Sequence, residues 1–173
     1  QNNARTRLPQ WSDAEFAAHI DQFPKAYWTG FDCDSHVRHA ELCAKFRQQD
    51  MPLLIDFRPD TAKRITELTI LTADDPGLFS RIAGAVAAVG ANIAGARITT
   101  CHDGTVLDVF FLQDMHNAAI DSPAELDKLR TILESSLRGE FRLEKALAAR
   151  WQQTPLRVRQ LPVPSRVILS NKI

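Results

Sequence analysis

The fold is decided by Thr72-Ala-Asp-Asp-Pro-Gly-Leu-Phe79, where a strand is expected to turn into a helix. Alternating apolar residues at 65–72 are typical of a strand. Asp75 is the expected N-cap of the helix and Pro76 its first residue, where a missing N–H costs nothing. An apolar stripe at helical spacing then runs to Gly90, which predicts the helix end. Unpaired N–H groups at a helix start bind anions, so this turn is a candidate for binding the charged groups of an amino acid.

The elements expected after residue 90 are a strand, a turn with the Asp-Gly signal, a returning strand, a helix and a closing strand. The helix is opened by Ser122-Pro-Ala-Glu125, which predicts an N-cap, a first-turn proline and a capping box. The order from residue 65 is therefore β-α-β-β-α-β, a ferredoxin-like α+β unit whose sheet edge can pair with a second copy. The expected bounds are 92–100 for the first strand, 102–104 for the turn, 105–112 for the returning strand and 165–170 for the closing strand.

The N-terminal part reads as a helical connector over residues 1–52. A capping box begins at Ser12, Pro24 ends the first helix, and a second helix is expected at 34–49. Residues 53–173 form the second domain, opened by a short strand at 53–57. The expected division of that domain is a core at 65–138, a linker that can hold a further helix at 139–164, and the closing strand.

Composition excludes several classes of protein. Of 173 residues, 45% are hydrophobic and 24% charged, and 21 basic residues balance 21 acidic ones. This balance predicts no nucleic-acid or anionic-membrane partner, and no apolar run reaches the ~20 residues of a membrane span. Three cysteines without CxxC spacing indicate reduced thiols and a cytoplasmic protein. Because the chain begins at Gln1 rather than Met, we expect a piece of a longer protein.

Residues 66–112 resemble an ACT domain, a small regulatory module that binds amino acids where two modules meet. The stretches 67–79, 96–100 and 103–111 are most similar to the first ACT domain of bacterial protein-PII uridylyltransferase/uridylyl-removing enzymes, and 162–169 resembles its last strand. The resemblance implies a glutamine sensor that works with a second ACT domain, in the same chain or in a dimer partner.

The resembling enzymes add and remove uridylyl groups on the PII protein in nitrogen regulation, through a nucleotidyltransferase and a metal-dependent phosphodiesterase. Their catalytic domains imply Mg²⁺. This chain has neither a Gly-Ser with a downstream Asp-x-Asp nor a His-Asp metal motif. We therefore expect it to be catalytically silent, without catalytic residues, cofactor or metal of its own.

The resemblance also implies ligand-binding residues. Asp74, two residues before the proline, would accept from the α-ammonium, and Asn92 would both donate and accept. The backbone N–H groups of Gly77 and Leu78 would receive the α-carboxylate, and Thr72 is a weaker candidate. The chain differs from the usual motif at Asp75, where a basic or polar residue is typical.

Plainer interpretations stand beside these. Asp74 and Asp75 also suit an ordinary cap and turn, and Asn92 also suits a left-handed backbone. Asp108, on an otherwise apolar strand, is interpreted as a partner of Arg97 across the hairpin rather than as a ligand group. A run of four zinc-type ligands is better explained by packing on one helix face. That run comprises Cys33, His36, His39 and Cys43.

Two other functions stay open. One is an ACT domain from a different amino-acid-responsive enzyme, such as a biosynthetic dehydrogenase or a stringent-response synthetase. The other is a structural or dimerising module with an empty site. The part of the full gene upstream of this domain would test the first alternative, since it encodes either a nucleotidyltransferase with a His-Asp phosphodiesterase or something else. Substitution of Asp74 and Asn92 together would test the second.

Overall fold

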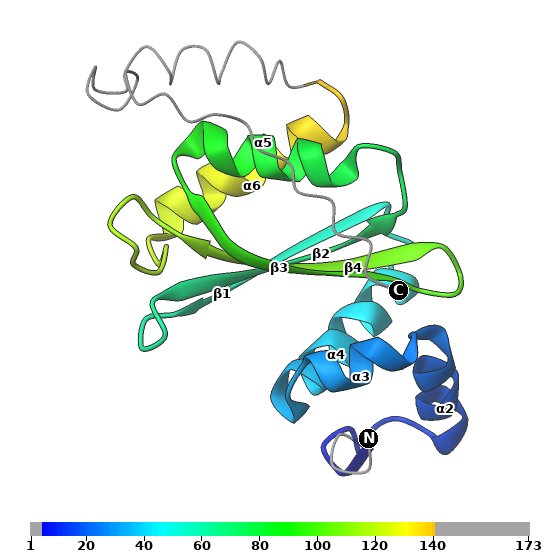
Figure 1. Cartoon of the computed structure of the whole chain (residues 1–173). Helices are drawn as coiled ribbons and strands as arrows, with labels where there is room; N and C mark the ends of the chain where they lie inside the picture. Colours follow the sequence, from blue (N-terminus) through cyan, green and yellow to red (C-terminus); the bar gives the residue numbers. More distant parts are fainter. Residues whose placement is uncertain (1–4, 141–173) are drawn as a thin grey trace, which may run out of the picture.

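The computed structural model of the chain describes residues 5–140 (Figure 1). A single four-stranded antiparallel sheet lies in the middle, with α5 (Leu78–Val89) and α6 (Pro123–Leu137) on one face (Figure 1). The other face carries the N-terminal helices α2 (Asp13–Gln22), α3 (Lys25–Gly30) and α4 (Cys33–Gln48). The sheet is thus covered on both sides, which explains why the inner strand at residues 105–113 is largely apolar on both faces.

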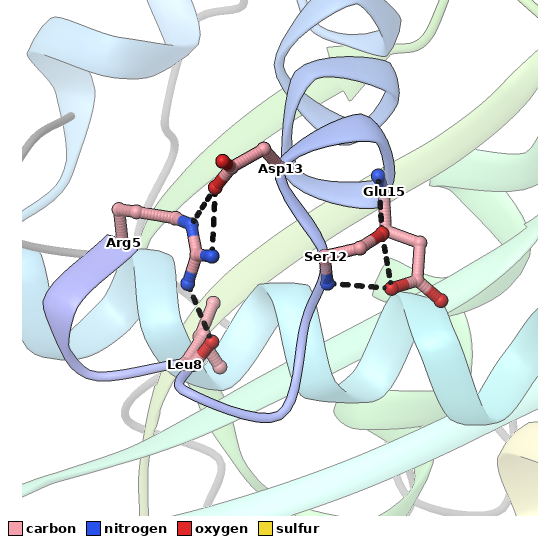
Figure 2. Close-up of polar contacts among 5 residues, drawn as sticks. All are labelled: Arg5, Leu8, Ser12, Asp13 and Glu15. Carbon is pink, nitrogen blue, oxygen red and sulfur yellow. Dashed lines mark hydrogen bonds and ion pairs between the residues drawn. The ribbon is translucent and has the colours of Figure 1, made fainter.

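The predicted capping box at the start of α2 is confirmed. The Ser12 hydroxyl accepts from the Glu15 N–H at 3.2 Å, and the Glu15 carboxylate accepts from the Ser12 N–H at 2.7 Å (Figure 2). The same figure shows Arg5 donating to the Asp13 carboxylate at 2.8 Å and to the Leu8 carbonyl at 3.0 Å. These contacts satisfy first-turn N–H groups of the helix and hold the preceding segment against it.

Pro24 ends α2 as predicted. It is also the N-cap of α3, a six-residue helix that was not among the predicted elements. Its aromatic residues fill the space between α2, α4 and the sheet, and Phe23 stacks on Tyr27 with ring centroids 4.2 Å apart. Helix α4 is capped by Asp32, whose side chain accepts from the Ser35 N–H at 2.8 Å.

The four strands are β1 (Leu53–Asp60), β2 (Ile65–Ala73), β3 (Asn92–Thr100) and β4 (Thr105–Gln113), in the order β1-β2-β4-β3. This is the predicted ferredoxin-like α+β arrangement, which is confirmed. The edge beside β2 is filled by β1, which hairpins back onto it and tolerates Pro59 because an edge strand has one unpaired side. The closing strand predicted at 165–170 and the further helix of the linker lie outside the described residues.

One apolar core lies on each side of the sheet, and β4 contributes side chains to both. Val106, Phe110 and Leu112 point toward α5 and α6, whereas Leu107 and Val109 point toward α3 and α4. β4 is therefore an inner strand of the sheet, covered on both faces. None of the helices within residues 5–140 has the length and hydropathy needed to cross a membrane.

The helix at Ser122 begins as predicted, with Pro123 in its first turn, but the capping box is wrong. The Ser122 side chain makes no cap hydrogen bond. Its carbonyl instead accepts from the Leu126 N–H at 3.0 Å, which is the ordinary first bond inside a helix.

Candidate functional site

The loop between β2 and α5 is a β-turn over residues 75–78, in which the Leu78 N–H donates to the Asp75 carbonyl at 3.0 Å. Gly77 has φ 82° and ψ 7°, the conformation that the third residue of a type II turn requires. Helix α5 therefore begins at Leu78, with Gly77 as its N-cap. The prediction of Asp75 as N-cap and Pro76 as first helical residue is wrong, because Pro-Gly closes this turn before the helix starts.

Asp75 is occupied by an ion pair inside the same loop. Its carboxylate contacts the guanidinium of Arg81, one turn into α5, and Arg81 also donates to the Pro76 carbonyl at 3.2 Å. The departure from the usual motif is thus compensated locally, because an arginine neutralises the extra acid. Asp74 is left as the acid of the loop without an ion pair.

Asp74 is exposed, and its carboxylate has no hydrogen bond or ion pair with any residue between 5 and 140. Its backbone N–H donates to the Gly104 carbonyl at 3.0 Å, which fixes the loop to the β3–β4 hairpin. The neighbouring Thr72 hydroxyl donates to the Pro52 carbonyl at 3.0 Å. Asp74 can therefore accept from a ligand, whereas the Thr72 donor is already used.

The first turn of α5 provides the positive end of a helix dipole next to this acid. The Leu78 N–H is used in the turn, and the first intrahelical bond of the helix runs from the Arg81 N–H to the Gly77 carbonyl at 3.0 Å. The N–H groups of Phe79 and Ser80 lie between these two and have no acceptor within the helix. Donors for an anion are thus present slightly further along than Gly77 and Leu78.

Asn92 lies at the opposite end of the sheet from the loop. Strand β3 begins at Asn92, which faces Gln113 at the end of β4, whereas Ala73 before the loop faces Thr105 at the start of β4. Eight residues of β4 separate these two positions, or about 26 Å at the usual rise of a strand. The structure therefore does not bring Asn92 and Asp74 together within one chain.

Asp108 lies on the face of the sheet that carries α5, where it faces Ile70 on β2 and Ile98 on β3. The predicted pair with Arg97 is wrong, since Arg97 faces Val109 and therefore points to the opposite side of the sheet. There the Arg97 guanidinium lies 5.1 Å from the centre of the Phe31 ring.

The Asp108 side chain is nearly fully buried, with 2% of the residue exposed, and its Oδ1 has no hydrogen-bond partner among residues 5–140. Burial raises the pKa of Asp108 to about 6; a hydrogen bond from the Thr99 backbone opposes this rise, and the Asp74 carboxylate adds to it. The sequence shows this acid on an otherwise apolar strand, but the predicted pair with Arg97 placed it on the wrong face of the sheet. The parity of the hairpin pairing, in which residue 100 faces residue 106, would have given the correct side.

The zinc-type run on α4 does not converge on one point. His39 is fully buried and its Nδ1 lies 3.1 Å from the Tyr27 hydroxyl, while Cys43 packs in the apolar core beneath the sheet. Cys33 packs in a separate cluster with Leu8. Within residues 5–140, no group of three or more potential ligand side chains is placed to hold a metal ion.

The sheet order, the two helices on one face and the Pro-Gly loop at the end of β2 define a ferredoxin-like α+β module, consistent with an ACT domain. No family model matches the chain. Curated relatives do. The chain is 38% identical over 165 residues to a bifunctional uridylyltransferase/uridylyl-removing enzyme of Rhodospirillum rubrum. The aligned region covers 95% of the chain and 18% of that enzyme.

Enzymes of the same description from two other bacteria give similar matches. The chain is 40% identical over 165 residues to that of Gluconobacter oxydans, covering 95% of the chain and 17% of the enzyme. It is 38% identical over 168 residues to that of Azospirillum brasilense, covering 96% and 18%. The chain is therefore homologous to one segment of the bifunctional uridylyltransferase/uridylyl-removing enzymes, and it spans less than a fifth of their length.

Proposed function

We propose that this chain is an amino-acid-sensing module, specific for glutamine, of a bifunctional enzyme that adds and removes uridylyl groups on the PII protein. The proposal is carried by the similarity over 95% of the chain to one segment of such enzymes. The active sites, their Mg²⁺ and the contact with PII would then belong to other parts of the parent protein. This module would report the glutamine level to them.

The loop supports an amino-acid ligand rather than a simple anion. It offers an acid without an ion pair, Asp74, next to a helix start with unused N–H groups at Phe79 and Ser80. An α-ammonium and an α-carboxylate need opposite partners of this kind. A sensor for a millimolar metabolite needs only about 4 kcal/mol of binding free energy, which a few charge-assisted hydrogen bonds can supply.

The position of Asn92 supports a site shared between two modules. Among the strands within residues 5–140, β3 is an edge strand with one side unpaired. Antiparallel pairing of two such edges would bring Asn92 of one copy beside Thr100 of the other, at the end of the sheet that carries the Asp74 loop. The second module would be a further ACT domain of the parent chain or a second copy of this one.

Calorimetry with glutamine tests the proposal, on this chain and on a longer protein that includes the second module. We expect binding at millimolar or lower concentration, weakened at least about tenfold by Asp74→Asn. The matched control is Asp127→Asn, an exposed acid on α6, which should bind as the wild type does. Absence of heat with glutamine in both folded proteins would contradict sensing and favour a purely structural module.

A further inference from the structure

Asp108 is a buried acid on the sheet face that carries α5, and no residue between 5 and 140 neutralises its charge. Asp108 points to the face that carries α5, and Phe110, the next residue of β4 on that face, has its ring centroid 5.7 Å from that of Phe79 in the first turn. The Asp74 carboxylate is close enough to influence the ionisation of Asp108. Asp108 thus lies on the sheet face that carries the start of α5, within electrostatic reach of Asp74.

No basic side chain of residues 5–140 forms an ion pair with Asp108. Arg81, the basic residue of the α5 start, bonds to Asp75, and Arg97 lies on the other face over Phe31. A buried carboxylate oxygen without a hydrogen-bond partner is costly, and a second acid nearby adds to that cost. A cation bound from solution would reduce the cost of the unpartnered oxygen and the repulsion between the two acids.

We propose that Asp108 is the residue that binds the ammonium group of an amino acid whose carboxylate is held by the first-turn N–H groups of α5. This inference rests on the proposed function and gives it a second acidic contact, deeper than Asp74. The arrangement of two acids beside one helix start is complementary to a zwitterion, since the acids repel a bare anion and the helix dipole disfavours a bare cation.

Among residues 5–140, the Asp108 carboxylate accepts a hydrogen bond from the Thr99 backbone, whereas its Oδ1 has no partner and is available to a ligand. Bound ammonium would supply the hydrogen bond that Oδ1 lacks. The exposed loop before the helix and the half-exposed ring of Phe79, 50% accessible, are the parts that can shift to admit a ligand. Ligand binding would then reorganise the start of α5.

The test compares glutamine with glutaramate, which is glutamine without its α-amino group, in wild type, Asp108→Asn and the control Asp127→Asn. Asparagine keeps the shape of the side chain and removes only the charge. We expect Asp108→Asn to lose at least about tenfold in affinity for glutamine and to bind glutaramate as weakly as the wild type does. Equal glutamine affinity in wild type and Asp108→Asn would overturn the inference while leaving the proposed function intact.

A second readout works without assuming that glutamine is the ligand. Carboxyl-carbon NMR of Asp108 follows its titration in the presence of each common amino acid and of ammonium chloride. A downward shift of the Asp108 pKa with an amino acid, larger than that with ammonium chloride, supports the inference even if glutamine fails. No shift with any of them, or an equal shift with ammonium chloride, overturns it.

Discussion

The backbone N–H of Asp74 donates to the carbonyl oxygen of Gly104 across 3.0 Å, so the candidate ligand loop is tied to the tip of the β3–β4 hairpin. The hairpin is tied in turn to α2, because the His102 N–H donates to the Gln22 carbonyl at 2.9 Å. A continuous set of hydrogen bonds therefore connects the Asp74 loop with the N-terminal helices through a single tight turn.

The first prediction concerns that turn. Gly104 has φ 82°, and a Cβ built there meets nothing within 4 Å, so Gly104→Ala would add backbone strain without a clash. We expect a loss of about 1–2 kcal/mol in the free energy of unfolding, measured by urea denaturation. We also expect weaker amino-acid binding, because relief of the strain at residue 104 would displace the carbonyl that accepts from the Asp74 N–H.

Gly139 provides the control for this substitution. It has φ 74° and equally open surroundings, but it lies after α6 and away from the loop. Gly139→Ala should therefore cost a similar amount of stability and leave binding unchanged. Equal loss of binding in both variants would show that the effect comes from stability alone.

The second prediction concerns Asp108 and pH. The folded pKa of about 6 lies above the ordinary value of 3.8, so the folded state binds the proton more tightly than the unfolded state. The penalty is full above about pH 6 and is relieved as the pH falls toward 4. Asp108→Asn should therefore raise the free energy of unfolding near pH 8 by up to about 3 kcal/mol.

The measurement is urea denaturation of wild type and Asp108→Asn at about pH 8 and pH 5. The advantage of the variant should shrink at the lower pH, because the wild-type carboxyl is then protonated. Asp127→Asn, on the surface of α6, should show no such change. A wild type more stable than Asp108→Asn at pH 8 would mean that the buried charge has a structural partner.

The sequence predicted most of the fold and less of the site, for physical reasons. Element types and turns depend on local chemistry, so the Ser12 capping box, the helix end at Gly90 and the Asp-Gly hairpin were found. The face occupied by Asp108 depends on pairing register, and the use of β1 as the edge strand depends on tertiary contacts that no short motif records. The Asp75–Arg81 ion pair was missed because capping and ion pairing compete for one carboxylate.

The third prediction concerns His19, which is buried with both ring nitrogens unpaired among Trp11, Phe23 and Trp28. Burial lowers its pKa to about 4, so the unfolded state takes up the proton first as the pH falls below 6.5. His19 therefore lowers the free energy of unfolding progressively as the pH falls from about 6.5 to 4. The penalty from Asp108 changes in the opposite direction, because it shrinks as the pH falls. His19→Leu should remove about 2 kcal/mol of the stability loss between pH 7 and pH 5.

His39 is the comparison for His19, because burial also lowers its pKa, to about 3, but its Nδ1 is bonded to Tyr27. His39→Leu should reduce the acid sensitivity as well, yet cost stability at pH 7, since it leaves the buried Tyr27 hydroxyl without its partner. Urea midpoints at the two pH values separate these effects. An unchanged pH dependence in His19→Leu would contradict the assignment.

The last prediction concerns β3, which is an edge strand of the sheet within residues 5–140 and carries the exposed side chain of Ile98, 52% accessible. If the edge pairs with a second module, a lysine at this position should oppose it through charge and desolvation. Ile98→Lys is expected to shift the chain toward monomer in sedimentation velocity, because the charged side chain would oppose pairing of the two edges. Met115→Lys is the matched control, since Met115 is 70% exposed in the loop after β4 and away from this edge. The control should associate as the wild type does, whereas association that survives in Ile98→Lys would place the module contact on another surface.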